Sequence, residues 1–277
     1  MPQIEAFYKD TWDGNVVTRV QQHGSRLRGT MMPQGIQGTA ANRHWIRRYG
    51  KRSSFALLEN RNESPAAVAT GRDQRVFSYA KYGDREVFDD LDELKTQLAE
   101  PNGELLTGFI DDGERLYDDT LFTAFDATVI TGGTISTSTA AYDSSMTVAV
   151  DFVESGSTAN SDIGLGKIRQ AKRLLDANEV PKNERYLAIS AKQCNSLLRA
   201  TELQSVDFYD KTIANGRLAM LYGFNLIESE RIPTDGSSYR ECFYWWKGAM
   251  KAGDTGYQTF IDENHPDYQH NTLVTVY

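Results

Sequence analysis

The stretch from Gly164 to Lys167 is the part of this sequence closest to a nucleotide-binding loop. Gly164-Leu165-Gly166 matches the start of the dinucleotide-binding fingerprint, and Gly166-Lys167 matches the end of a phosphate-binding loop. However, the third glycine position of the fingerprint holds Arg169, and Ile168 stands where the loop needs a hydroxyl residue. We therefore expect both glycines to lie in the first turns of a helix, with a phosphate-binding α/β enzyme as the alternative.

The histidines do not form a zinc motif. None of the four lies in a His-Glu-x-x-His or cysteine-rich context. Two of them share one segment with three acidic residues: His265, His270, Asp262, Glu263 and Asp267. A solvated acidic loop explains this segment better than a metal site, so we expect no metal ion.

The sequence also shows no motif typical of a catalytic nucleophile or of a catalytic acid–base pair. No Gly-x-Ser-x-Gly elbow is present, and Cys194 falls on the apolar face of a predicted helix, where a buried thiol is the ordinary role. The adjacent pair Asp111-Asp112 lies in a predicted helix, and neighbouring helical residues point in different directions. We therefore predict no catalytic residue and no cofactor, and a chain that is not an enzyme.

Composition indicates a globular protein with an uneven charge distribution. The 277 residues are 40% hydrophobic and 25% charged, with a net charge of −8. Residues 1–52 carry +6, whereas residues 84–126 carry −11. We find no signal peptide and no run of about 20 apolar residues, so we expect no membrane partner. A basic arm and an acidic helical stretch in one chain suggest electrostatic contacts between copies.

In the N-terminal half, segments with the apolar spacing of helices flank one long segment that has too few apolar residues to form its own core. We predict a helix over residues 2–22, an extended excursion over residues 29–80 and a helix over about 104–127. The excursion contains weak strands at 55–58 and 75–79, and an apolar stripe predicts a further helix over 84–100. A coreless segment of about fifty residues makes sense when it packs on neighbouring subunits.

The C-terminal half predicts helices packed on a mostly antiparallel sheet, which is an α+β domain. A helix begins near Ser161 or Asp162 as its cap and stops before Pro181. Further helices are predicted at 191–199 and 208–215. Strands are predicted at 146–152, 186–190, 222–227, 242–246, 257–261 and 272–277.

Six short motifs are spread along the chain. They are residues 21–28 (QQHGSRLR), 115–119 (RLYDD), 168–181 (IRQAKRLLDANEVP), 185–190 (RYLAIS), 222–224 (YGF) and 228–233 (ESERIP). In sequence and in order they resemble, along nearly the whole chain, the major capsid proteins of tailed bacteriophages, the family with the Hong Kong 97-type fold.

The resemblance implies a specific domain organisation. It implies an N-terminal helix and arm over 1–45, an extended E-loop over 46–83, and the long spine helix with peripheral-domain elements over 84–150. An axial domain follows over 151–245, and strands over 246–277 return to the peripheral domain.

The resemblance also implies function, partners and location. Copies of the chain would form hexamers and pentamers of an icosahedral virion head, assembled in the host cytoplasm around double-stranded DNA that is contacted without sequence specificity. A portal protein would be a partner, as would scaffold and decoration proteins where these are used. An encapsulin-like nanocompartment shell is the alternative with the same fold, and a tail or decoration protein is a more distant one.

The charge split leads to a hypothesis about contacts between subunits. Basic residues of the arm and loop would meet acidic residues of an adjacent copy, or would face packaged DNA instead. The basic residues are Arg43, Arg47, Arg48, Lys51 and Arg52, and the acidic residues are Asp84, Glu86, Asp89 and Asp90. A second hypothesis, implied by the resemblance, is a covalent cross-link through Lys51 or Lys81.

Overall fold

A computed structural model describes most of the chain, and in it the chain divides into two compact units. The first unit comprises Met1–Arg28, Lys81–Thr120 and Asp254–Tyr277, and the second comprises Gly29–Ala80 and Leu121–Gly253. The described residues are 21–34, 43–52, 55, 57–58, 64–88, 103–132, 137–154, 156, 160–200, 213–214, 217–237, 239–254, 256–262, 266 and 272–277. The helix predicted over 2–22 therefore falls almost entirely outside them. Within these ranges no helix has both the length and the apolar character needed to span a bilayer.

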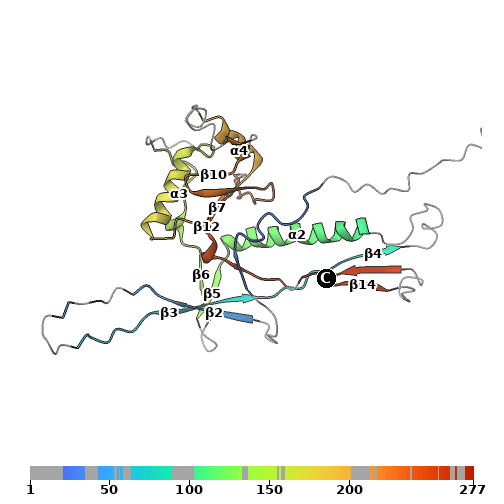
Figure 1. Cartoon of the computed structure of the whole chain (residues 1–277), viewed down its shortest axis with the longest axis horizontal. Coiled ribbons are helices and arrows are strands. Elements are labelled where there is room, and N and C mark those ends of the chain that lie inside the picture. The colour runs from blue at the N-terminus through green and yellow to red at the C-terminus, as the bar shows by residue number, and fades with distance from the viewer. Residues whose placement is uncertain are drawn as a thin grey trace, which may run out of the picture. The chain divides into compact units, whose positions relative to one another are not determined.

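The first unit contains most of helix α2 and a three-stranded antiparallel sheet (Figure 1). Helix α2 (Gly103–Phe125) confirms the helix predicted there. The sheet has β15 (Thr272–Val276) between β14 (Thr259–Asp262) and β4 (Asp84–Phe88). The start of the helix predicted over 84–100 is wrong, because pairing with β15 holds residues 84–88 as a strand. The rest of that prediction falls on residues outside the described ranges.

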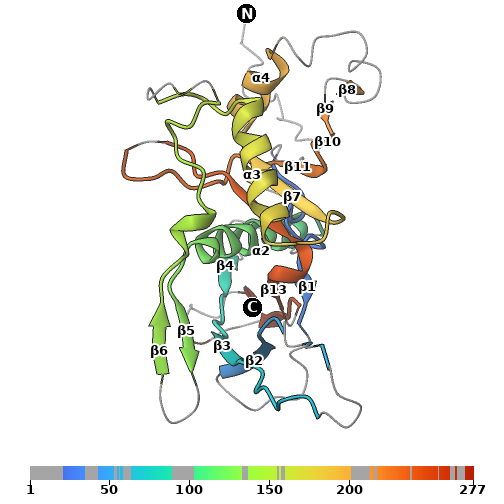
Figure 2. The same cartoon turned by 90° about the vertical axis from the view of Figure 1, so that its left-hand side faces the viewer.

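The second unit is built around a four-stranded mixed sheet with helix α3 packed on it (Figure 2). Strand β7 (Arg185–Ile189) is central. It pairs in parallel with β11 (Phe224–Glu228) and antiparallel with β12 (Phe243–Trp246), and β10 (Met220–Leu221) pairs with β11. Two of the three strand pairs are antiparallel, so the expectation of a mostly antiparallel sheet is confirmed, with the β7–β11 pair as the parallel exception.

Apolar spacing explains how the two helices of this unit pack. Helix α3 (Leu165–Ala177) buries Leu165, Ile168, Ala171 and Leu175, which recur on one face. Helix α4 (Ala191–Leu198) begins with a capping box in which Ser190 and Gln193 bond each other's backbone N–H groups. Each large side chain fully buried in this core stabilises the fold by roughly 1.5–3 kcal/mol.

A second sheet in this unit carries a long two-stranded ribbon (Figure 1). Strands β2 (Arg43–Tyr49) and β3 (Arg72–Ser78) pair over seven residues, and β3 then meets β5 (Val129–Gly132), which pairs with β6 (Thr137–Ala140). The strand predicted at 75–79 is found as part of β3. The one predicted at 55–58 is wrong, since the described residues there form no strand.

The remaining elements are short. Strands β1 (Met32–Pro33) and β13 (Lys251–Ala252) pair in parallel, and the indole nitrogen Nε1 of Trp245 donates to the Thr30 carbonyl oxygen beside them at 3.1 Å. The others are β8 (Ile213–Ala214) with β9 (Arg217–Leu218), and the 3-10 turns η2 (Ser144–Met146) and η3 (Lys247–Ala249).

Three local predictions are corrected by these elements. Residues 146–152 form no strand: Met146 ends η2, and Met146 and Val148 pack against the α3–β7 core instead of pairing with another strand. Residues 213–214 pair as β8 and do not continue a helix from 208. Gly164, not Ser161 or Asp162, caps α3, because the backbone N–H of Ser161 donates to the Val150 carbonyl in the preceding loop.

Candidate functional site

The glycine-rich turn before α3 is a structural tie. The ammonium of Lys167 donates to the carbonyl oxygens of Val150 and Ser161, both at 2.6 Å, and so joins the preceding loop to the helix. Burial lowers the pKa of this lysine. Arg169, in place of the third glycine, pairs with Glu154 at 2.8 Å. The two cationic side chains that could bind an anion here, Lys167 and Arg169, are thus already bound to groups of the same chain.

The basic residues singled out in the sequence lie on and just after strand β2. Arg43 begins β2, Arg47 and Arg48 are exposed near its end, and Lys51 and Arg52 follow it as exposed residues. Two of these cations have carboxylate partners in the same chain: Arg48 pairs with Asp73 at 2.6 Å, and Lys51 pairs with Glu179 after α3. The second pair ties the loop end of the ribbon, just beyond the Tyr49–Arg72 pair, to the loop between α3 and β7.

The two faces of the β2–β3 ribbon differ in charge. Strand alternation and register place Arg47, Tyr49 and Arg72 on one face, which carries no acidic residue. The Arg72 guanidinium lies 5.9 Å from the centroid of the exposed Tyr49 ring. On the other face burial, and then the charge of Arg48, lower the pKa of Arg75, although Asp73 opposes this effect. The first face is therefore the better candidate for binding an anionic partner.

The acidic residues singled out in the sequence are only partly described. Asp84 and Glu86 are exposed on β4, opposite Val276 and Val274 of β15. Asp89 and Asp90 lie outside the described residues. Lys81, the second candidate for a cross-link, has its ammonium 3.6 Å from the centroid of the Tyr277 ring.

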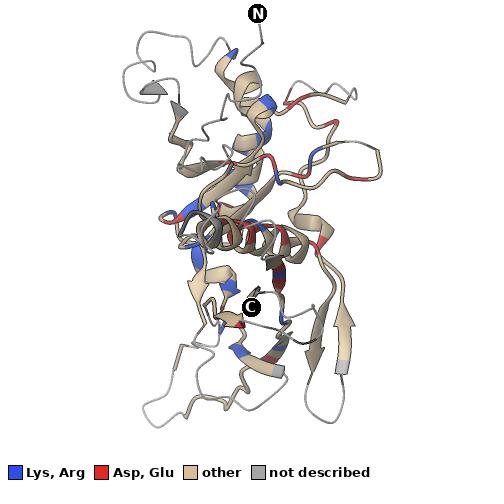
Figure 3. Ribbon diagram, turned by 90° about the vertical axis from the view of Figure 1, so that its right-hand side faces the viewer, with Lys and Arg blue, Asp and Glu red and all other residues tan. Residues whose placement is uncertain are grey.

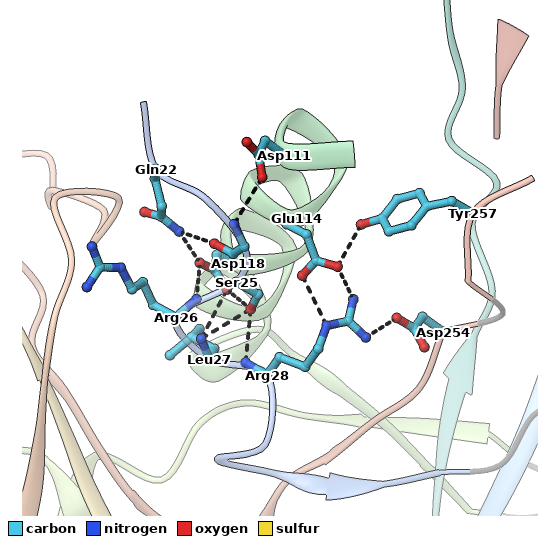
Figure 4. A network of polar contacts seen from close by, with 11 residues as sticks. Gln22, Ser25, Arg26, Leu27, Arg28, Asp111, Glu114, Asp118, Asp254 and Tyr257 are labelled. Carbon is cyan, nitrogen blue, oxygen red and sulfur yellow. Dashed lines mark hydrogen bonds and ion pairs between the residues drawn. The ribbon is translucent and has the colours of Figure 1, made fainter. Parts of the chain in front are cut away.

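Helix α2 carries a buried carboxylate that sequence reasoning did not assign to any role. Asp118 is completely buried, and its oxygens accept four hydrogen bonds from the N-terminal segment (Figure 4). The Gln22 amide donates at 3.0 Å, and the backbone N–H groups of Arg26 and Leu27 donate at 2.9 and 3.2 Å. The Ser25 hydroxyl provides the fourth bond.

A second carboxylate on the same helix face binds the same segment. Asp111 lies seven residues before Asp118, which is two helical turns. It accepts the Gly24 backbone N–H at 3.1 Å and contacts Nδ1 of His23 at 2.5 Å. Gly24 has a φ of +68°, a left-handed conformation that glycine adopts without strain. Figure 3 shows that acidic residues recur along this helix.

Between these two carboxylates, Glu114 joins the N-terminal segment to the segment before β14. Arg28 donates to Glu114 through Nε at 3.0 Å and Nη2 at 2.8 Å, and also pairs with Asp254. Its guanidinium lies 4.6 Å from the centroid of the Tyr117 ring. Burial alone would lower the pKa of Arg28, but the bonds to both carboxylates raise it. The Tyr257 hydroxyl donates to Glu114 at 3.1 Å, as Figure 4 shows.

These contacts bring together two of the sequence motifs. Residues 21–28 and residues 115–119 are about ninety positions apart, yet they form one polar site in the first unit. The signal in the sequence was the spacing of Asp111, Glu114 and Asp118 by three and four residues, which places the three carboxylates on one helix face. Within the described part of the chain, no group of three or more His, Cys, Asp or Glu side chains is placed to hold a metal ion.

Comparison with solved structures identifies the fold. The capsid of cyanophage Pam1 is 11% identical with a TM-score of 0.72, over 99% of this chain and 91% of that one. A chain from Mycobacterium phage Che8 is 13% identical with a TM-score of 0.65, over 98% and 90%. The mature capsid of bacteriophage PhiM1 is 12% identical with a TM-score of 0.64, over 98% and 86%. These matches confirm the Hong Kong 97-type capsid fold expected from the sequence.

Sequence comparison identifies the family. No curated protein matches the chain. The family described as "Phage capsid protein" matches residues 4–276, which is almost the whole sequence. The resemblance drawn from the short motifs is thereby confirmed, and the chain belongs to the phage capsid protein family.

Proposed function

We propose that this chain is the major capsid protein of a tailed bacteriophage, assembling as hexamers and pentamers into an icosahedral head around double-stranded DNA. The observation that carries the proposal is the family match over residues 4–276. The subunit resides in the virion after assembly in the host cytoplasm and performs no catalysis. A portal protein would join the shell, together with scaffold and decoration proteins where these are used.

We assign the parts of the capsid fold as follows. The arm covers 1–45, the E-loop covers 46–83, and 84–150 holds the spine helix with peripheral elements. The axial domain covers 151–245, and 246–277 returns to the peripheral domain. The β2–β3 ribbon, the 23-residue helix α2 and the pairing of β15 with β4 support this assignment.

We further propose that the basic ribbon contacts an acidic surface of an adjacent subunit. The basic group is Arg43, Arg47, Arg48, Lys51 and Arg52, and the acidic group is Asp84, Glu86, Asp89 and Asp90. The supporting observation is the acid-free ribbon face bearing Arg47. Many weak contacts of this kind allow a shell to correct errors during assembly while the finished particle stays closed.

Electron microscopy with a sizing column tests the proposal. Purified protein should form closed icosahedral shells or separate hexamers and pentamers. DNA inside native particles distinguishes a phage head from a nanocompartment with the same fold. A chain that stays monomeric over a range of salt and protein concentration, even with the phage's own scaffold present, would contradict the assignment.

Charge reversal tests the ribbon contact separately. Arg47→Glu should reduce shell yield, and it is the cleanest variant because Arg48 already pairs with Asp73. Arg173→Glu, on an exposed position of α3, is the matched control. Normal empty shells that package less DNA would show that Arg47 faces DNA instead of a neighbouring subunit.

A further inference from the structure

The N-terminal segment is attached to α2 by hydrogen bonds that converge on one carboxylate. We propose that Asp118 is the positioning residue that holds residues 22–28 on α2 and fixes the register of this part of the N-terminal arm along the helix. The role of the arm in shell building depends on the proposed function, whereas the attachment itself is a property of the single subunit.

The hydrogen-bonding capacity of Asp118 is fully used by this segment. An ionised carboxylate offers about four acceptor positions, and four donors of the segment occupy them. Two of the donors, the backbone N–H groups of Arg26 and Leu27, lie outside any helix or strand. A buried N–H group without a hydrogen-bond acceptor destabilises the folded state. By supplying acceptors for these N–H groups, Asp118 stabilises the turn against α2.

The site binds both the backbone of a turn and the side chain that closes it. Ser25 Oγ accepts the Arg28 backbone N–H at 2.9 Å and the Leu27 backbone N–H at 3.2 Å, so Ser25 closes the turn while it also bonds Asp118. Gly24 supplies the left-handed conformation that directs its own N–H to Asp111. This geometry fixes the register of the segment along the helix.

The attachment is mostly polar. Among residues 22–28 only Leu27 is buried, with no exposed surface, and the other six residues are at least partly exposed. Loss of the bonds to Asp118 should therefore release the segment without unfolding α2, in which Leu121 and Phe122 are buried independently of this segment's polar bonds. An asparagine at this position is a poor substitute, because its amide NH₂ would face donors of the segment.

Limited trypsin digestion of the full-length, unassembled subunit tests the anchor. Trypsin cuts after Arg26 and Arg28, and cleavage of these bonds requires the segment to leave the helix. In Asp118→Asn we expect both bonds to be cut about tenfold faster or more, as read by mass spectrometry, with unchanged cleavage after Arg173. Asp84→Asn removes the same charge at an exposed position of β4 in the same unit and should behave like the wild type.

A second variant keeps the test decisive if Asp118→Asn does not fold. Ser25→Ala leaves α2 intact and removes the hydroxyl from the turn, so hydrogen exchange at the Arg26 and Leu27 amides should accelerate. Wild-type cleavage and exchange rates in the folded variants would overturn the anchor. If the segment is released but shells form normally, the anchor stands and its role in placing the arm for assembly is overturned.

Discussion

A Cβ atom on Gly113 would lie 2.5 Å from Cε1 of the Tyr257 ring and 3.0 Å from its hydroxyl oxygen. Real side chains essentially never approach so closely, so the glycine leaves room for the tyrosine against α2. This close approach lets the Tyr257 hydroxyl reach Glu114, which also binds Arg28. A glycine that weakens the helix by about 1 kcal/mol relative to alanine therefore permits the packing of a distant segment.

Alanine substitutions at two glycines of α2 should have opposite effects. Gly113→Ala should lower the free energy of unfolding by roughly 1–3 kcal/mol, because the new methyl group displaces the Tyr257 ring. Gly108→Ala is the matched control, since nothing lies within 4 Å of its Cβ, and it should raise stability by up to about 1 kcal/mol. Urea denaturation measures both. Equal stabilisation by the two variants would contradict the packing argument.

Tyr257 should make the subunit sensitive to strong alkali. Burial, and then the charge of Glu114, raise the pKa of Tyr257 to about 12. The unfolded chain ionises this group near pH 10, so its contribution is fully present below pH 10 and is lost as pH rises through 12. The unfolding free energy of Tyr257→Phe should fall less steeply than that of the wild type between pH 9.5 and 11.5. Parallel slopes would show that the hydroxyl is not held as described.

Cys242 should be a slow nucleophile in the folded subunit. Burial raises the pKa of its thiol to about 11, so little thiolate exists at neutral pH. Iodoacetamide at pH 8 should modify the partly buried Cys242 only after denaturant is added, and Cys194, which is buried and whose thiol pKa is raised by burial, should behave in the same way. Peptide mapping by mass spectrometry distinguishes the two thiols. Rapid native labelling of Cys242 would contradict its placement.

Arg185 should hold the loop between α3 and β7. Its guanidinium is buried, donates to the Pro181 and Val180 carbonyl oxygens at 2.8 and 2.6 Å, and pairs with Asp176 at 2.7 Å. Arg185→Met should lower the free energy of unfolding by roughly 1–3 kcal/mol, whereas the exposed Arg173→Met should change it little. Thermal denaturation of the two variants compares them directly, and similar transitions would refute this role.

The same pair should respond to acid. The hydrogen bond from Arg185 lowers the pKa of Asp176 below its ordinary value of 3.8. Its stabilising contribution is therefore present above about pH 4 and is lost as pH falls below that value. Asp176→Asn should remove this part of the acid sensitivity, which denaturation curves at pH 5 and pH 3 would reveal. An unchanged difference between the two pH values would contradict the assignment.

Sequence patterns located the helices whose conformation is determined by the residues within them. The apolar spacing of α3 and α4 and the length of α2 are local properties, so these helices were predicted to within a few residues, although the cap of α3 was misplaced. Residues 84–88 and 146–152 were predicted wrongly because their conformations depend on distant partners. Pairing with β15 decides the first, and packing on the α3–β7 core decides the second.

For function, the sequence alone determined the family, since short motifs in a fixed order suffice to mark a capsid protein. It also determined the charge split between residues 1–52 and 84–126. Only the tertiary structure decided what Asp118 and Asp111 do. A carboxylate on a helix has no preset partner, and four donors converge on Asp118 only when a segment about ninety residues away folds back against that face. Such contacts depend on chain topology, which residue types and spacing do not specify.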